Sequence, residues 1–197
     1  MKLILASASP RRAEILQAAG FPFSVLHSAV DETPSPNELP TDLVQRLANA
    51  KAELVAARAV GPAIVIAADT VVAVDARILG KPRSSDEARK MLELISARMH
   101  TVLTGVSLVR LPDVERREFV EATQVHFARM TPDEISAYLA TDEPFDKAGA
   151  YAIQGIGGRY VTRIEGDYFN VVGLPLSRLA RALSELGYHA EQVATEM

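Results

Sequence analysis

The sequence predicts an α/β or α+β fold built on a mixed sheet. Apolar, β-rich runs alternate with amphipathic runs along the chain, and several amphipathic runs start at residues that cap helices. The composition agrees, because 48% hydrophobic residues over 197 positions suffice for a substantial core. No clean break in composition marks a boundary, so we expect residues 1–197 to form a single domain, in one piece or with two lobes.

Helix and strand signals alternate through the first third of the chain. A glycine after the first helical pattern is typical of a helix end. Three prolines interrupt regular structure before a threonine that can cap the next helix. The expected elements are a strand at 2–6, a helix at 11–19 closed by Gly20, a strand at 21–26, a loop at 31–40 and a long helix from Thr41 to about Val60.

A buried strand and a hairpin are expected next. Residues 62–75 are rich in β-branched and apolar side chains, and their first half predicts a buried strand. The sequence Asp75-Ala76-Arg77 allows a turn, so residues 78–82 can return as the second arm of a hairpin.

Capping signals place the remaining helices. Serines and early acids start a helix at 84–97, and residues 131–134 form a capping box with proline at the first helical position. The other expected elements are strands at 101–110 and 117–128, a helix end near Ala140, a glycine-rich loop at 147–158, strand-like stretches at 160–167 and 169–173, and an amphipathic helix at 174–187.

The composition excludes several function classes. Cysteine is absent from the sequence, which rules out disulfides and thiolate metal sites. A net charge of −4 argues against a general nucleic-acid-binding protein, because such proteins carry a basic excess. No apolar run reaches transmembrane length, and the apolar start before Ser7 is too short for a signal peptide. We therefore expect a cytoplasmic protein with no nucleic-acid or membrane partner.

Two arginines stand where the first helix is expected to begin. With Ser9 as N-cap and Pro10 as the first helical residue, Arg11 and Arg12 occupy the first turn. The helix dipole disfavours each cation there by about a few tenths of a kcal/mol, while the free N–H groups of that turn bind anions. Arginine also binds phosphate bidentately. The pattern indicates either a phosphate site or two solvated surface arginines.

Charged residues also interrupt apolar patterns further along. At 100° per residue, five apolar side chains of the helix from Thr41 span an arc of about 120° that includes Lys51. A lysine there must extend to water or meet an anion, for example at the edge of a phosphate pocket. Asp69 follows an apolar strand, where an ionised carboxylate needs a partner. It fits a metal ligand, a general base or a turn.

Three further features have both a functional and an ordinary interpretation. A hairpin would bring Lys81 back toward Asp69, as a structural or a catalytic ion pair. Asp31 and Glu32 could hold a divalent cation, although exposed loop acids are the simpler interpretation. In the glycine-rich loop, Gln154 has the donors and acceptor to read a base edge, unless this is an ordinary tight loop.

The ordered set of motifs resembles the Maf family of nucleoside triphosphate pyrophosphatases over nearly the whole chain. The resemblance implies a two-lobed α/β fold around a central mixed sheet, similar to inosine triphosphatases, with the nucleotide in a cleft between the lobes. The motifs are LASASPRR at 5–12, VDET at 30–33, Lys51 in NAKAE, ADTVV at 68–72, GKP at 80–82, TGV at 104–106, DKAGAYAIQG at 146–155 and NVVGLPL at 170–176.

The resemblance also implies an activity. A nucleoside triphosphate would be hydrolysed between its α and β phosphates to the monophosphate and pyrophosphate, with Mg²⁺ or Mn²⁺ as the divalent cation. Asp69 matches the family's proton acceptor, and Glu32 and Asp69 would help to hold the metal. The other residues that match the polar active-site set are Ser7, Arg12, Glu32, Lys51 and Lys81.

Three positions track substrate choice in the family, and here they are Arg11, Thr70 and Gln154. This combination is similar to the branch that acts on dTTP, UTP and related pyrimidine nucleotides. The resemblance makes a homodimer the expected assembly. Two alternatives stay open: a house-cleaning pyrophosphatase for noncanonical purine nucleotides, and a regulator of septum formation and cell division.

Overall fold

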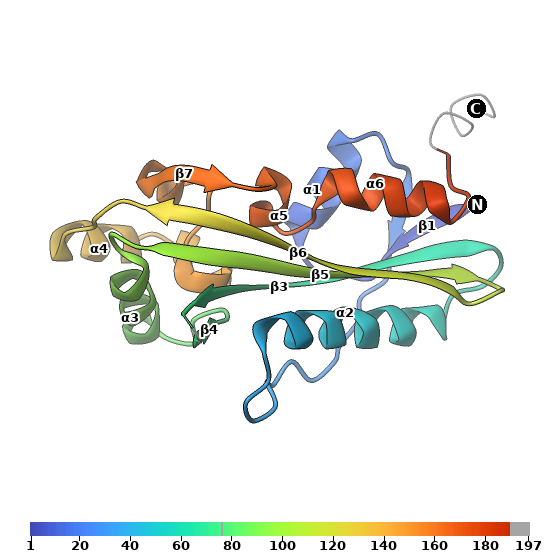
Figure 1. Ribbon diagram of the computed structural model, residues 1–197, viewed down its shortest axis with the longest axis horizontal. Coiled ribbons are helices and arrows are strands. Elements are labelled where there is room, and N and C mark those ends of the chain that lie inside the picture. The colour runs from blue at the N-terminus through green and yellow to red at the C-terminus, as the bar shows by residue number, and fades with distance from the viewer. Residues whose placement is uncertain (76, 190–197) are drawn as a thin grey trace. The chain divides into compact units, whose positions relative to one another are not determined.

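The computed structural model describes residues 1–75 and 77–189, and Figure 1 shows how the helices and strands follow one another. The strands are β1 (Lys2–Leu5), β2 (Phe23–Val25), β3 (Ala63–Val74), β4 (Arg77–Leu79), β5 (Met99–Leu111), β6 (Glu115–Phe127) and β7 (Val161–Glu165). The α-helices are α1 (Pro10–Ala18), α2 (Pro40–Ala56), α3 (Ser85–Ile95), α4 (Pro132–Leu139), α5 (Tyr168–Val172) and α6 (Leu176–Glu185). Short 3-10 helices η1 (Glu143–Asp146), η2 (Ala148–Ala150) and η3 (Ile156–Tyr160) follow α4. Within these described ranges, no helix is both long and apolar enough to cross a membrane.

The strands of the described residues form one mixed sheet of seven, in the order β2-β1-β3-β5-β6-β7 with β4 paired to β3. β1 pairs in parallel with β2 and with β3, and the intervening chain returns through helices as parallel pairing requires. β4 pairs antiparallel with β3, and β7 pairs antiparallel with β6. The predicted α/β class with a mixed sheet is therefore confirmed, as is the hairpin of β3 and β4.

The described residues form two compact units, each made of separate stretches of chain. The first unit takes Met1–Asp69, Thr104–Val120 and the C-terminal segment from Gly173. The second unit takes Thr70–Leu103 and Glu121–Val172. Thus β3, β5 and β6 each contribute residues to both units. The expectation of a single domain over residues 1–197 stays a prediction.

In the first unit, α2 covers one face of the strands, and α1 and α6 lie on the other face (Figure 1). Ala52 of α2 packs with Val65 of β3 in a buried apolar cluster. The helix also approaches β5 closely, because a Cβ on Gly105 would stand 2.4 Å from the carbonyl oxygen of Val44 on α2. A side chain at position 105 would push the helix backbone away from the strand.

The second unit has its own core of aliphatic and aromatic side chains. The rings of Phe127 and Tyr151 meet edge to face with centroids 5.0 Å apart, and Tyr160 lies 5.9 Å from Phe127. His100 is buried in the same cluster, where its Nε2 lies 2.7 Å from the hydroxyl oxygen of Tyr151. The imidazole therefore has a polar partner inside an otherwise apolar core.

The start and end of α2 differ from the prediction. Leu39 is the N-cap and Pro40 is the first helical residue, so Thr41 lies inside the helix that it was expected to cap. Proline is suited to this position because its missing N–H would have had no helical acceptor. The helix ends at Ala56, several residues before the expected end near Val60.

The predicted strand at 169–173 is wrong, because residues 168–172 form α5. Asp167 explains the difference: its carboxylate accepts a hydrogen bond of 3.1 Å from the N–H of Asn170, as an N-cap does for the third helical residue. The side chain of Asn170 then donates to the carbonyl of Val102 at 3.1 Å. The remaining predicted helices and strands are confirmed with boundaries that differ by a few residues.

Candidate functional site

The first turn of α1 carries the predicted arginine pair. Ser9 is the N-cap and Pro10 the first helical residue, as expected. Arg12 is only 9% exposed, so the interpretation as a solvated surface residue is wrong for it. Its Nε donates to the carbonyl of Gly173 at 2.8 Å, and its Nη1 donates to Ser7 Oγ at 3.2 Å. These bonds fix the guanidinium and the Ser7 hydroxyl at the N-terminal end of the helix.

The charges around Arg12 are mixed. Burial lowers the pKa of its guanidinium, the negative charge of Asp69 opposes this, and the positive charge of Arg11 adds to the lowering. Arginine keeps its proton at any physiological pH, so this turn holds a buried positive charge with a second one close by. Arg11 itself is partly buried. The arrangement favours a ligand that brings negative charge.

Lys51 meets anions and does not extend to water. It lies on the buried face of α2, with 7% of the residue exposed. Its Nζ lies 2.6 Å from Asp69 Oδ1 and 2.6 Å from Glu32 Oε1. The ammonium thus stands between two carboxylates, one buried and one 57% exposed. The lysine on the apolar stripe is explained by these two partners.

Asp69 finds its cationic partner in Lys51. It is 8% exposed and lies within β3, where an unpaired carboxylate would be costly. The hairpin predicts that Lys81 returns toward Asp69, as a structural or a catalytic ion pair. Lys81 is an exposed residue of the second unit, two positions after the end of β4. Its catalytic role stays a prediction.

The neighbouring acids Asp31 and Glu32 behave differently. Asp31 is exposed, and its Oδ1 accepts a hydrogen bond of 2.9 Å from the N–H of Thr33, as expected for an ordinary loop acid. Glu32 is also exposed but binds Lys51. Asp31 therefore bonds to its own loop, and Glu32 is the carboxylate that reaches Lys51.

Arg46 and Glu38, which no sequence pattern indicated, hold the loop that carries Glu32. Arg46 on α2 donates to both carboxylate oxygens of Glu38, at 2.6 and 2.8 Å, and to the carbonyl of Thr33 at 3.2 Å. Glu38 also accepts from the N–H of Ser35 at 2.8 Å. The bonds from Arg46 and Ser35 lower the pKa of Glu38 to about 2. No regular spacing links these residues, so periodicity could not reveal them.

A second missed residue is Glu143 at the start of η1. Its carboxylate accepts hydrogen bonds from the N–H groups of Ile156 and Gly157, at 2.8 and 2.9 Å. The turn that it holds carries the exposed Gln154. The glycine at 155 could have indicated that another group lies close to the backbone there, although the sequence does not say which residue provides that group.

The acids Glu32 and Asp69 suit the predicted divalent cation. Both carboxylates converge on the Lys51 ammonium, so their oxygens already surround one cationic group. Mg²⁺ commonly binds through one or two carboxylates with phosphate and water oxygens. Within residues 1–75 and 77–189, no group of three or more acid or histidine side chains suitable for a metal is present.

The predicted site residues divide between the two units. The first unit brings together Ser7 with Arg12, and Lys51 with Glu32 and Asp69. Arg11 is beside Arg12 on α1. The second unit contains the other three, which are Thr70 directly after Asp69 on β3, Lys81 after β4, and Gln154 before η3.

A buried guanidinium at a helix N-terminus and a carboxylate–ammonium–carboxylate group lie within one unit of an α/β protein. A helix N-terminus can bind a phosphate group and a carboxylate can accept a proton, so this unit has groups suited to an enzyme that acts on a phosphorylated substrate. The family model described as Maf-like protein matches residues 2–186, and the chain belongs to the Maf family. The resemblance predicted from the motifs is confirmed.

Curated relatives match over nearly the whole chain. The dTTP/UTP pyrophosphatase of Syntrophus aciditrophicus (strain SB) is 49% identical over 186 residues, which cover 94% of this chain and 90% of that protein. The dTTP/UTP pyrophosphatase of Carboxydothermus hydrogenoformans is 50% identical over 189 residues, 95% of this chain and 100% of that protein. Among solved structures, a HAM1 protein from Coxiella burnetii shares the fold, with a TM-score of 0.51 at 15% identity over 94% of this chain and 99% of that one.

Proposed function

We propose that this protein hydrolyses dTTP and UTP, and related modified pyrimidine nucleotides, to the nucleoside monophosphate and pyrophosphate. The observation that carries the proposal is the identity of about half of all residues with two relatives named dTTP/UTP pyrophosphatase, over more than nine-tenths of the chain. The acidic net charge does not oppose a polyanionic substrate, because Arg11 and Arg12 place two adjacent positive charges at one point of the chain.

We assign the phosphate contacts and the proton transfer of this reaction to side chains of the first unit. The hydroxyl of Ser7 and the guanidinium of Arg12 bind the phosphates, and Arg12 stabilises the charge that develops on the leaving pyrophosphate. Water attacks the α-phosphorus, the bond from that phosphorus to the bridging oxygen of the β-phosphate breaks, and Asp69 accepts the proton from the water. Lys51 holds the Asp69 carboxylate in place through their 2.6 Å contact.

The proposed cofactor is Mg²⁺ or Mn²⁺, held by Glu32 and Asp69 together with phosphate oxygens of the substrate. When bound, the ion would supply Lewis-acid stabilisation of the phosphate charge. Lys81 adds a further positive charge for the triphosphate. Arg11, Thr70 and Gln154 select the nucleotide, with Gln154 offering a donor and an acceptor to a base edge. We further propose a cytoplasmic homodimer without a nucleic-acid partner.

A nucleotide panel tests the proposal. The purified protein is incubated with dTTP, UTP, CTP, GTP and ITP, in Mg²⁺ or in Mn²⁺, and the released pyrophosphate and monophosphate are measured. We expect kcat/KM to be highest for dTTP and UTP, with one pyrophosphate per monophosphate. Absence of pyrophosphate from every nucleotide would overturn the proposal, and a strong preference for ITP would replace it with the purine alternative.

A cell-division role is tested separately. If the chain acts as a regulator of septum formation through its enzymatic activity, Asp69→Asn should abolish the effect of its overproduction on septation. An effect that survives this substitution would assign regulation to a function independent of hydrolysis.

A further inference from the structure

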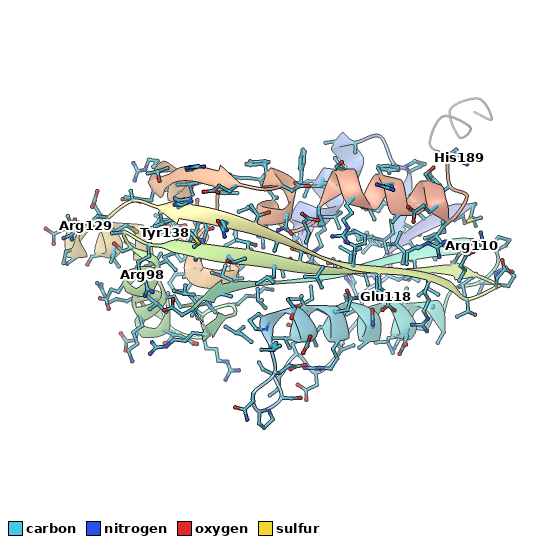
Figure 2. All side chains as sticks on the ribbon, in the orientation of Figure 1. Arg98, Arg110, Glu118, Arg129, Tyr138 and His189 are labelled. Carbon is cyan, nitrogen blue, oxygen red and sulfur yellow. The ribbon has the colours of Figure 1, made fainter. Side chains whose placement is uncertain are left out.

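The turn at residues 152–157 is held from one side by two side chains of the second unit. Glu143 Oε2 accepts from the N–H of Ile156 at 2.8 Å, and Glu143 Oε1 accepts from the N–H of Gly157 at 2.9 Å. The hydroxyl of Tyr138, on α4 and labelled in Figure 2, donates a hydrogen bond of 2.7 Å to Glu143 Oε1. The same hydroxyl oxygen accepts a hydrogen bond of 3.3 Å from the N–H of Ala152. Glu143 and Tyr138 thus form an anchor that holds the turn at both of its ends.

The chemistry of Glu143 shows that it is an ionised acceptor in this arrangement. Three donors converge on its two oxygens, and only a carboxylate presents acceptors in all these directions. Burial acts to raise the pKa of the Glu143 carboxyl, but the hydrogen bonds from Gly157, Tyr138 and Ile156, together with the charge of Lys147, outweigh burial and lower it. Hydrogen bonds to a charged acceptor are stronger than neutral ones, so the anchor is stiff.

Gly155 supports the same conclusion independently. Its φ of −122° is negative, so a left-handed backbone is not what requires a glycine here. A Cβ at this position would stand 2.0 Å from Glu143 Oε2, and one at Gly157 would stand 2.6 Å from the Tyr138 hydroxyl oxygen. At Gly155 and Gly157 the turn lacks the side chains that would collide with Glu143 and Tyr138.

We propose that Glu143 is a positioning residue that fixes the backbone on either side of Gln154 and thereby sets which nucleotide base the enzyme accepts. Gln154 lies inside the anchored turn, one residue before Gly155 and two before Ile156. An amide side chain that reads a base edge discriminates only if its own backbone is fixed, because a small displacement weakens both of its hydrogen bonds. This inference rests on the proposed nucleotide pyrophosphatase function.

The first test compares a substitution of Glu143 with the same substitution at a glutamate that does not contact the turn. Glu143→Gln replaces one acceptor oxygen by an NH2 group, which cannot accept a hydrogen bond from the backbone N–H that it faces. We expect the ratio of kcat/KM for dTTP to that for ITP to fall about tenfold, mainly through KM for dTTP, with kcat changed by less than about threefold. The matched control is Glu134→Gln, which makes the same charge change in the capping box of α4, where Glu134 accepts from Thr131 N–H at 2.7 Å. It should leave the ranking of nucleotides unchanged.

A double-mutant cycle tests the contact itself. Gly155→Ala in the natural sequence should displace the Glu143 carboxylate and reduce the dTTP:ITP ratio as Glu143→Gln does. In a Glu143→Ala background, the alanine at 155 has room, so adding it should change the ratio by less than about twofold. Hydrogen exchange at Ile156 and Gly157 should rise in each variant that breaks the anchor. Tyr138→Phe should also reduce the dTTP:ITP ratio, but by less. This variant tests the same contact if the Glu143 variants do not fold.

The outcomes separate the two proposals. Pyrimidine-selective hydrolysis by the natural protein, with an unchanged ranking in Glu143→Gln and Gly155→Ala, overturns the role of Glu143 and leaves the proposed function standing. An equal loss of ranking in Glu134→Gln also overturns it, because the effect would then be general to the unit. Absence of hydrolysis by the natural protein overturns the proposed function together with this inference.

Discussion

Lys51 on α2 and Asp69 on β3 form an ion pair of 2.6 Å in which both side chains are nearly buried, with 9% and 11% of their surfaces exposed. The two residues are 18 positions apart, and the pairing is made because α2 lies with its apolar face toward the sheet. Removing Lys51 leaves Asp69 as a buried charge that has lost its ion-pair partner, whereas removing Asp69 leaves Lys51 with a second carboxylate in Glu32. The pair therefore links the stability of the first unit to its proposed chemistry.

Asp69→Asn is expected to abolish turnover while the fold is retained. The amide has the shape of the carboxylate and can still accept from Lys51, but it cannot take a proton from water. Pyrophosphate release should fall at least about a hundredfold, as is typical when a general base is lost. The melting temperature should be measured alongside. Asp75→Asn is the control, since that carboxylate is 75% exposed and pairs with Arg98. Turnover by Asp69→Asn close to that of the natural protein would contradict the role of Asp69.

Lys51→Met is expected to destabilise the protein by about 3–5 kcal/mol, because the buried Asp69 carboxylate loses its counter-charge. Urea unfolding measures this change. Lys51→Met combined with Asp69→Leu should recover part of the loss, since neither charge then remains buried. Lys90→Met on α3 is the matched control at an exposed lysine and should change stability by less than about 0.5 kcal/mol. If the single and double variants are equally unstable, the ion pair is not the cause.

The two arginines of α1 should have different phenotypes. Arg12→Ala removes bonds to Gly173 and Ser7 together with a buried charge, so we expect both a large loss of kcat/KM for every nucleotide and reduced stability. Arg11→Ala should instead change the ranking of nucleotides and leave the melting temperature nearly unchanged. The measurement is kcat/KM over the nucleotide panel with a thermal melt of each variant. A uniform loss over all nucleotides in Arg11→Ala would assign that residue to phosphate binding as well.

Stability should fall on acidification in a range set by His100. Burial, with a contribution from the charge of His126, lowers the pKa of His100 from 6.5 to about 4. The unfolded chain binds this proton at higher pH than the folded protein does. The stabilisation is therefore complete above pH 6.5 and is lost between about pH 6.5 and 4, by up to about 3 kcal/mol.

Urea unfolding at several pH values checks this. The double variant His100→Leu/Tyr151→Phe removes both polar partners from the core and should flatten the pH dependence in that range. His27→Gln, at an exposed histidine, should keep the slope of the natural protein. A double variant with an unchanged slope would show that another group titrates there.

Sequence patterns predicted the elements whose signals are local. The capping box of α4 and the apolar run of β3 were sufficient, because each is specified by neighbouring residues. Lys51 could be singled out because a charge on an apolar stripe breaks the pattern of its own helix. The stretch 169–173 has the apolar and β-branched residues of a strand, and the Asp167 bond to Asn170 that starts a helix there is not visible in that pattern.

The parts of the site that were missed depend on tertiary contacts. Glu38 and Arg46 belong to a loop and a helix, and Glu143 meets its partners 13 and 14 residues later across an irregular turn. No period relates such residues. The choice of Lys51 as the partner of Asp69 was hidden for the same reason, because only the packing of α2 on the strands brings them together.

The ammonium between Glu32 and Asp69 also bears on how folding and ion binding are related. A zinc finger unfolds when a chelator removes its metal, because its ligands have no other means of being held together. Here a tethered cation, Lys51, already holds the two acids in place. EDTA should therefore leave the unfolding curve of this protein where it was, so that loss of activity in the chelator reports on catalysis alone.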